Sequence, residues 1–181
     1  MTESPSPTTK RILVVYATRG GTTRDLAEQV AESLRANGSG VEILAAKKVR
    51  DITPYDAVVL GSAIYFRQLM PQAVRFLEQN ASYLTTHPIA IFSVGAQMRK
   101  NVTKNHAVVD RWVRGSLKGV PQLQPVAIEH FAGAIQFKRL NLLWRLLVLI
   151  TFSELGDWRN LKAVQDWANR IYPQLINRPN T

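Results

Sequence analysis

The residues best suited to chemistry in this sequence form a short loop of glycines and hydroxyls. Residues 12–17 are almost entirely apolar, and the chain then reads Thr-Arg-Gly-Gly-Thr-Thr before a helical pattern begins. Glycine lets the backbone approach a ligand closely, and threonine hydroxyls can donate hydrogen bonds to phosphate oxygens. The first N–H groups of the following helix, and the positive end of its dipole, would point at the same place. We therefore predict a phosphate-binding loop formed by Thr18, Arg19, Gly20, Gly21, Thr22 and Thr23.

The spacing within this loop limits the kind of phosphate compound that it would bind. The sequence contains neither G-x-x-x-x-G-K-[ST] nor G-x-G-x-x-G with an acidic ribose partner, the two commonest nucleotide loops. Neutral donors without a lysine suit a terminal phosphate monoester, and the loop resembles the flavin mononucleotide (FMN) loop of the flavodoxins, T-x-T-G-x-T. Arg19 stands where the second hydroxyl often lies, so it could add charge at the phosphate or point to solvent. A simpler alternative is that Thr22 and Asp25 form a capping box that only starts the helix.

Two later segments could bind the flat ring of such a cofactor. Small residues and two aromatics follow the apolar run 57–61, and a glycine-containing segment ends the run 89–94. A flavin needs an apolar or aromatic cover on one face and backbone donors at its edge. Tyr65 and Phe66 are candidates for the cover, although one could instead be a core residue and the other a lone surface aromatic. The predicted ring contacts are Ser62, Ala63, Ile64, Tyr65 and Phe66 in the first segment and Ser93, Val94, Gly95, Ala96 and Gln97 in the second.

The rest of the sequence supplies a scaffold that would bring these loops together. Helical patterns alternate with strand-like runs at residues 12–17, 41–45, 57–61, 89–94 and 126–135. Such alternation is typical of an α/β fold, and the first helix should end at Asn37-Gly38, where glycine permits a left-handed turn. We predict a flavodoxin-like doubly wound sheet of five parallel strands in the order 2-1-3-4-5, with the ligand beyond the carboxyl ends of the strands. An amphipathic helix closes the fold with Leu161, Val164, Trp167, Ala168 and Ile171.

Composition favours one cofactor-dependent domain and excludes thiol chemistry. The 181 residues are 46% hydrophobic, enough for a single sizeable core, and include no cysteine. Disulfides, thiol nucleophiles and cysteine-ligated clusters are therefore excluded, so any electron chemistry must come from an organic cofactor. His87, His106 and His130 lie far apart in the sequence with no ligand spacing, which predicts surface or loop histidines and no metal site.

The net charge of +10 and the pI of about 10.3 imply an anionic partner. No basic stretch interleaved with aromatics appears, so nucleic acid is not the expected partner. Basic residues around one predicted helix are expected to form a solvated face: Lys100, Lys104, Arg111, Arg114 and Lys118. Residues 1–10 are polar and proline-rich without the apolar centre of a signal peptide, which predicts a disordered lead, a single domain over residues 11–181 and a cytoplasmic protein.

Residues 136–152 are the most apolar segment and are additional to the elements of a minimal flavodoxin. The segment is shorter than the roughly 20 apolar residues needed to span a bilayer. A wide apolar face, the basic pair Lys138 and Arg139, and Trp144 favour a helix lying in a membrane interface, in contact through residues 138–152. A buried core helix or a dimer seam is the alternative, which leaves a homo-oligomer open.

Several motifs taken together resemble the menaquinone-dependent protoporphyrinogen oxidase family, from about Arg11 to the C-terminus. The motifs are Tyr16-Ala17-Thr18-Arg19-Gly20-Gly21-Thr22-Thr23, Val59-Leu60-Gly61-Ser62-Ala63-Ile64, Phe92-Ser93-Val94, and Gly156-Asp157-Trp158-Arg159 ahead of Trp167-Ala168. The resemblance implies an FMN-bound enzyme of heme biosynthesis that oxidises protoporphyrinogen IX to protoporphyrin IX and passes the electrons to a quinone. Because a quinone is dissolved in lipid, the resemblance also implies a peripheral protein on the inner face of the cell membrane.

The porphyrin carries carboxylates, so cations near the flavin edge would hold it. The candidates are Arg67, Arg99, Lys100, Lys138 and Arg139. No side chain is required as a catalytic base, since the flavin carries the difficult step and the protein supplies position and electrostatics.

Other functions remain open at this point. A plain flavodoxin-type electron carrier is one, although flavodoxins are usually acidic and the basic pI argues against it. Another is an FMN-dependent quinone reductase with a nicotinamide donor, for which no second nucleotide motif is found. A non-catalytic module would keep the fold without flavin and use its basic apolar helix to dock on a partner or membrane.

Overall fold

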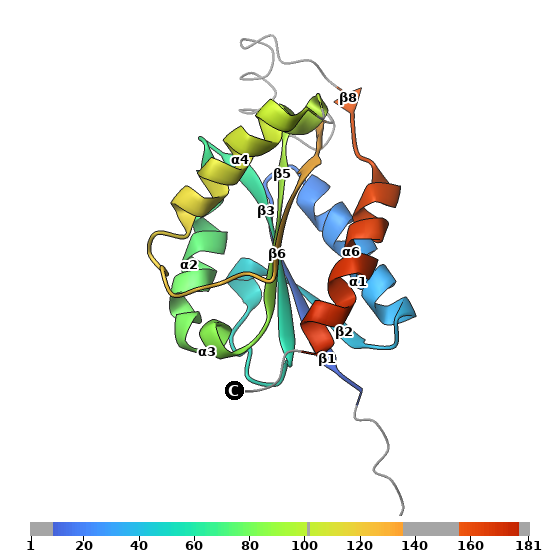
Figure 1. The fold of residues 1–181 in the computed structure, drawn as a ribbon, viewed down its shortest axis with the longest axis vertical. Coiled ribbons are helices and arrows are strands. Elements are labelled where there is room, and N and C mark those ends of the chain that lie inside the picture. Colours follow the sequence, from blue (N-terminus) through green and yellow to red (C-terminus); the bar gives the residue numbers. More distant parts are fainter. Residues whose placement is uncertain (1–8, 101, 136–155, 178–181) are drawn as a thin grey trace, which may run out of the picture.

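A parallel sheet forms the centre of the fold in the computed structural model, which describes residues 9–100, 102–135 and 156–177 (Figure 1). The sheet has the order β2-β1-β3-β5-β6. Its strands are β1 (Arg11–Ala17), β2 (Gly40–Ala45), β3 (Ala57–Tyr65), β5 (Ile89–Gly95) and β6 (Ala127–Ala132). These strands follow the predicted succession, because apolar runs such as those around Val14 and Val59 can be buried on both faces of a parallel sheet.

The structure contains three short strands that the sequence analysis did not predict as separate elements. β4 (Gln68–Leu69) pairs antiparallel with the end of β3, so the strand continues through residues 62–65, beyond the predicted run 57–61. The predicted strand 126–135 is two elements, β6 and β7 (Ala134–Ile135), and β7 pairs with β8 (Gly156–Asp157) in a separate small sheet. The break falls at Gly133, where a Cβ would lie 3.0 Å from Val94 Cγ1. The strand pattern continues across the break, so alternation alone could not locate it.

Helices cover both faces of the sheet (Figure 1). α1 (Thr22–Ala36) and α6 (Leu161–Ile176) pack on one face, with Trp167 5.8 Å from Phe92 between ring centroids. The predicted closing helix is thereby confirmed. The other face is covered by α2 (Pro71–Gln79), α3 (Ala81–Thr86) and α4 (Thr103–Ser116), while 3₁₀ turns η1 (Ala46–Lys48) and η2 (Ala96–Arg99) follow β2 and β5.

The first helix forms as predicted but starts differently from the capping-box alternative. Leu26 and Leu34 are fully buried, and the helix ends before Asn37 and Gly38, with Gly38 at φ 97°. At the other end, the N-cap is Gly21 at φ 88°, and no side chain caps the helix. The capping-box alternative is wrong, because Thr22 lies inside the first turn and cannot be the cap.

Two predictions fall outside the described residues. These are the apolar helix at 136–152, with Lys138 and Arg139, and the disordered lead, of which residues 9 and 10 alone are described. None of the helices within the described ranges has the length and apolar character needed to cross a bilayer.

Candidate functional site

The phosphate loop and the two predicted ring-binding segments meet at the carboxyl edge of the sheet. The parallel register places Ala17 of β1 opposite Ser62 of β3, and Ala63 of β3 opposite Val94 of β5. Neighbouring parallel strands in register end at one edge, so the segments that follow them emerge side by side. The edge between β1 and β3 is also where the winding of the sheet reverses, the usual ligand position in open α/β sheets.

Two threonines of the phosphate loop form hydrogen bonds with the backbone, one within the loop and one to the start of β7. The backbone N–H of Gly21 donates to Thr18 Oγ1 over 3.0 Å, and Thr22 Oγ1 donates to the carbonyl oxygen of Ala134 over 3.0 Å. A hydroxyl has one hydrogen to donate. Thr18 therefore keeps its donor for a ligand, whereas Thr22 uses its donor to hold the start of β7. The hydroxyls of Thr18 and Thr22 therefore have different roles, although their positions in the sequence did not distinguish them.

Thr23 is the residue whose environment fits a phosphate most directly. Its side chain is 1% exposed, and its Oγ1 has no hydrogen-bond partner among the described residues. A buried polar atom without a partner is costly, so such atoms commonly mark a missing ligand or ion. The first N–H groups of an α-helix also lack intrahelical partners. The loop can therefore accept a phosphate monoester through neutral donors, as its composition predicts.

Arg19 contacts the second loop. Its Cζ lies 4.4 Å from the ring centroid of Tyr65, and its Nη1 donates to the Tyr65 hydroxyl over 3.1 Å. Neither prediction for Arg19 anticipated this contact, because the two residues are 46 positions apart. The contact joins the phosphate loop to the segment predicted to cover the ring.

The two predicted ring covers differ strongly in exposure. Tyr65 is half-buried beneath Arg19, whereas Phe66 is 79% exposed. Phe66 and Arg67 form the turn between β3 and β4 with φ angles of 47° and 62°. Arg67, a predicted substrate contact, is thus at the tip of a tight hairpin at the site edge.

The side-chain hydroxyls of the serines in the predicted ring-binding segments form hydrogen bonds within the protein. Ser62 Oγ accepts from the Met70 N–H and donates to the Ala63 carbonyl, each over 2.9 Å. Ser93 Oγ is 2.8 Å from His130 Nδ1. Both serines are fully buried, so any contact from them to a ring would come from the backbone.

The third loop follows β5 and turns through η2. Gly95 and Ala96 lead into it, Gln97 is exposed, and Met98 is buried beneath it. The predicted substrate contact Arg99 lies over Trp158, with Cζ 5.1 Å from that ring.

His130 corrects the prediction that all three histidines are surface or loop residues. It lies in β6, is 7% exposed, and faces Asp110 and His106 on α4, with Nε2 3.8 Å from Asp110 Oδ1. The rings of His106 and His130 are 6.0 Å apart, although the sequence separates them widely. Burial lowers the pKa of His130 below its usual value, against the opposing effect of Asp110 and Glu129. In the described ranges, no three His, Asp or Glu side chains come together as a metal site.

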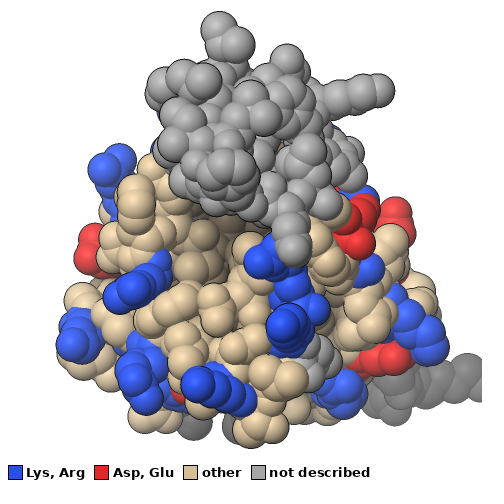
Figure 2. All heavy atoms as spheres, turned by 90° about the horizontal axis from the view of Figure 1, so that it is seen from above, with Lys and Arg blue, Asp and Glu red and all other residues tan. Residues whose placement is uncertain are grey.

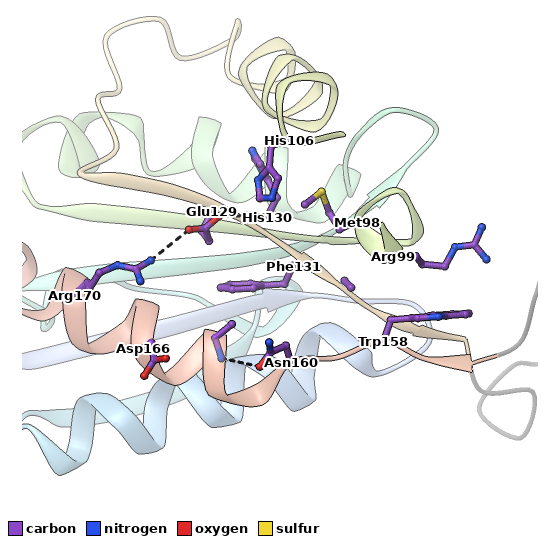
Figure 3. A pocket seen from close by; sticks show the side chains of 12 residues that line it. Met98, Arg99, His106, Glu129, His130, Phe131, Trp158, Asn160, Asp166 and Arg170 are labelled. Carbon is purple, nitrogen blue, oxygen red and sulfur yellow. Dashed lines mark hydrogen bonds and ion pairs between the residues drawn. The ribbon is translucent and has the colours of Figure 1, made fainter. Parts of the chain in front are cut away.

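A cavity of about 430 Å³ wraps around the free edge of β6 (Figure 3). His106 and His130 lie on one side of the strand and Phe131 on the other, and Arg99 and Trp158 stand at one end. Glu129 and Arg170 pair across it over 3.6 Å. Its mixed charges give it no single ligand chemistry.

Arg159 lies near the phosphate loop and pairs with a residue far away in the sequence. Its Nη1 donates to Asp25 Oδ2 in the first turn of α1 over 2.7 Å, and it also pairs with Asp157. The N–H of Trp158 donates to the Gly133 carbonyl over 3.3 Å. With the β7–β8 pairing, these contacts hold residues 135 and 156 beside the phosphate loop.

The carboxyl edge of the sheet carries positive charge. Seen from this edge, Lys and Arg side chains stand across the face (Figure 2). Exposed cations follow the ends of several strands: Lys47 and Lys48 after β2, Arg19 after β1, Arg67 after β3, and Arg99 and Lys100 after β5. A face of this charge attracts phosphates and carboxylates. On the predicted solvated face of α4, Arg114 pairs with Asp110 over 2.7 Å.

Comparisons with known proteins agree with this geometry. The chain matches the family described as Flavodoxin domain over residues 13–160. Protoporphyrinogen IX dehydrogenase (quinone) of Escherichia coli (strain K12) is 25% identical over 162 residues, which cover 87% of this chain and 88% of that protein. The protein of the same name from Leishmania major is 27% identical over 165 residues, which cover 87% of this chain and 70% of that protein.

Solved flavodoxins share the fold at low identity. Flavodoxin 1 from Bacillus cereus superposes with a TM-score of 0.59 at 12% identity, covering 93% of this chain and all of that one. The Streptococcus pneumoniae TIGR4 flavodoxin gives 0.58 at 14% identity, covering 91% and 99%. Flavodoxin-like sheets bind a flavin at the switch point between β1 and β3, so the fold implies a flavin cofactor. With the match over residues 13–160, this shows that the chain belongs to the Flavodoxin domain family.

Proposed function

We propose that this protein is an FMN-dependent dehydrogenase that oxidises protoporphyrinogen IX to protoporphyrin IX and delivers the electrons to a quinone. The single observation that carries the cofactor assignment is the buried, unpartnered hydroxyl of Thr23 in a loop of neutral donors at the switch point. The names of the relatives from Escherichia coli and Leishmania major supply the reaction. Together they favour an enzyme of heme biosynthesis over a general electron carrier.

The cofactor would be held by the three loops at the carboxyl edge of the sheet. The phosphate would lie against Gly20, Gly21 and the hydroxyls of Thr18 and Thr23, with the start of α1 contributing N–H groups. The ring would lie between Tyr65 and the loop from Ser93 to Gln97, with backbone contacts from the buried serines and from Ala63 and Ile64. FMN, when bound, supplies the acceptance and release of electrons.

The chain's own residues bind and orient the reactants. Arg67, Arg99 and Lys100 are exposed at the site edge and would pair with the porphyrin carboxylates, together with Lys138 and Arg139 outside the described residues. Guanidinium groups suit this task, because they present a planar fork of donors to a carboxylate. Tyr65 is held in place by Arg19 and so keeps a defined position beside the ring.

The acceptor sets the expected cellular position. A quinone is dissolved in lipid, so we propose a cytoplasmic protein that binds the inner face of the cell membrane through residues 138–152. Strands β7 and β8, which flank this part of the sequence, lie beside the phosphate loop, and such a membrane contact would bring the flavin near the bilayer. The basic character of the protein would assist binding to anionic lipids, and no nucleic acid partner is proposed. Homo-oligomer formation stays a prediction.

The test is spectroscopic. The protein is purified in detergent, its visible spectrum is recorded, and protoporphyrinogen IX is added without oxygen, followed by a quinone. The proposal expects a yellow protein whose flavin absorbance bleaches with the porphyrinogen and recovers with the quinone. A yellow protein that does not react with porphyrinogen would indicate an electron carrier or another quinone reductase. A colourless protein that takes up no added FMN would overturn the cofactor assignment.

A further inference from the structure

The hairpin tip formed by Phe66 and Arg67 has an unusual backbone. Their φ angles of 47° and 62° make them the two non-glycine residues with positive φ in the described ranges. A two-residue hairpin turn with positive φ at both positions normally carries Asn-Gly or Asp-Gly, because a Cβ crowds the backbone in this region. A bulky aromatic residue at such a position lowers stability.

Local packing does not explain why Phe66 occupies this position. The side chain is 79% exposed, so its ring contributes little to the core. Among the residues that the structure describes, its ring makes one aromatic contact, an edge contact with Tyr65 at 4.4 Å between centroids. Strained residues persist where the surrounding structure fixes them, and they cluster at ligand sites.

The base of the hairpin is held firmly. The N–H of Leu69 donates to Ser116 Oγ on α4, and the N–H of Met70 donates to the buried Ser62 Oγ, each over 2.9 Å. Arg19 holds Tyr65 at the other strand of the hairpin. The tip is therefore a fixed projection that presents an aromatic ring and a guanidinium side by side at the carboxyl edge of the sheet.

We propose that the hairpin tip is a substrate platform, on which a pyrrole ring of the tetrapyrrole packs against Phe66 while a carboxylate pairs with Arg67. This inference rests on the proposed function and deepens it by assigning the substrate contacts. It also reassigns Phe66 from the predicted flavin cover to the substrate, and leaves the cover to Tyr65. A ring with attached carboxylates matches an exposed aromatic next to a cation.

One substitution that suits the left-handed backbone and one that does not separate the effect of the ring from the effect of the strain. Phe66→Asn removes the ring and relaxes the turn, whereas Phe66→Trp keeps an aromatic. Titration of the FMN-loaded protein with protoporphyrin IX should show affinity about tenfold weaker in F66N and nearly unchanged in F66W. F66N should also raise Tm by about 2–4 °C, and FMN affinity should be unchanged in both variants.

The charge is tested with a modified porphyrin. Arg67→Asn should weaken protoporphyrin IX binding about threefold to fivefold, an amount typical of an exposed ion pair, and should have no effect on the dimethyl ester, which lacks the carboxylates. F66N should weaken binding of both compounds. Arg75→Gln on α2 removes an exposed cation outside the site and should change neither affinity.

The outcomes distinguish the two proposals. Wild-type protein that neither binds nor oxidises the porphyrin overturns the proposed function and this inference with it. Wild-type protein that does both, while F66N binds the porphyrin equally well, overturns the platform alone. A loss of FMN affinity in F66N would return Phe66 to the flavin, and a loss of binding to anionic vesicles without a change in porphyrin affinity would make the tip a membrane contact.

Discussion

The Arg19 guanidinium lies over the ring of Tyr65, 4.4 Å from its centroid, and donates to the Tyr65 hydroxyl over 3.1 Å. The contact crosses from the loop after β1 to the end of β3, so it couples the phosphate loop to the first predicted ring-binding segment. Arg19 thereby replaces a hydroxyl of the usual flavodoxin pattern with a side chain that organises the neighbouring loop.

A double-mutant cycle should measure this coupling. Arg19→Gln and Tyr65→Phe should each weaken FMN binding, and the pair should be non-additive by about 0.5–1 kcal/mol, the size of the exposed hydrogen bond from Arg19 to the Tyr65 hydroxyl that both variants remove. Fluorescence titration of the apoprotein with FMN measures it. Tyr83→Phe is the control, because Tyr83 bonds to the carbonyls of Thr53 and Tyr55 instead, and its combination with R19Q should be additive.

Thr23→Val should separate stability from cofactor binding. The variant removes a buried hydroxyl without a partner, so the apoprotein should gain about 1 kcal/mol of unfolding free energy. FMN affinity should fall at least tenfold, roughly the value of one hydrogen bond to a charged group. Calorimetry with FMN and with riboflavin checks the assignment, since riboflavin lacks the phosphate and its affinity should not change.

Two companion variants sharpen the comparison. Thr23→Ser keeps the hydroxyl and should keep FMN affinity. Thr22→Val should lower Tm, because it leaves the Ala134 carbonyl without its donor. Equal FMN affinity in wild type and T23V would remove Thr23 from the phosphate site.

The buried His130 should make the protein sensitive to mild acid. Burial holds its pKa in the folded state below the value of about 6.5 expected when unfolded, with His106 and Arg114 acting in the same direction and Asp110 and Glu129 opposing them. Below pH 6.5 the unfolded chain therefore binds the proton more readily. The contribution of neutral His130 to the unfolding free energy is fully present above pH 6.5 and falls as pH drops toward the folded-state pKa.

Urea unfolding from pH 8 to pH 5 tests this dependence. His130→Asn should flatten the acid side of the profile, since it removes the titrating group while retaining a polar partner for Ser93. His87→Asn is the matched control, because it removes a histidine that stacks on Tyr83 before β5 begins, away from His130. An unchanged acid slope in H130N would assign the pH dependence to other groups.

Arg159 should stabilise the elements on either side of residues 136–155. Its side chain is 18% exposed and bridges Asp25 and Asp157. Arg159→Gln should lower the unfolding free energy by about 1–2 kcal/mol, a typical value for partly buried charged hydrogen bonds. Thermal unfolding measures this as a Tm lower by about 2–8 °C. Arg24→Gln, which breaks an exposed pair with Glu28, is the control and should leave Tm nearly unchanged.

The sequence by itself determined the elements whose signals are local. The apolar run before Thr18, the repeat of Leu26, Val30 and Leu34, and the stop at Gly38 each lie within a few residues of what they specify, and the structure confirms the strand and the helix. The order of the main parallel strands was predicted from the resemblance to flavodoxins, because right-handed connections fix the hand of each crossover but not the strand order.

Only the tertiary structure decided which side chains meet. The partners of Arg19, Thr22 and His130 are 46, 112 and 37 residues away in the chain, so no local spacing could show the contacts. The break at Gly133 and the strained tip at Phe66 likewise depend on packing against other strands. Hydrophobic periodicity specifies which face of an element is buried, but the choice among polar partners depends on the distances that the assembled sheet creates.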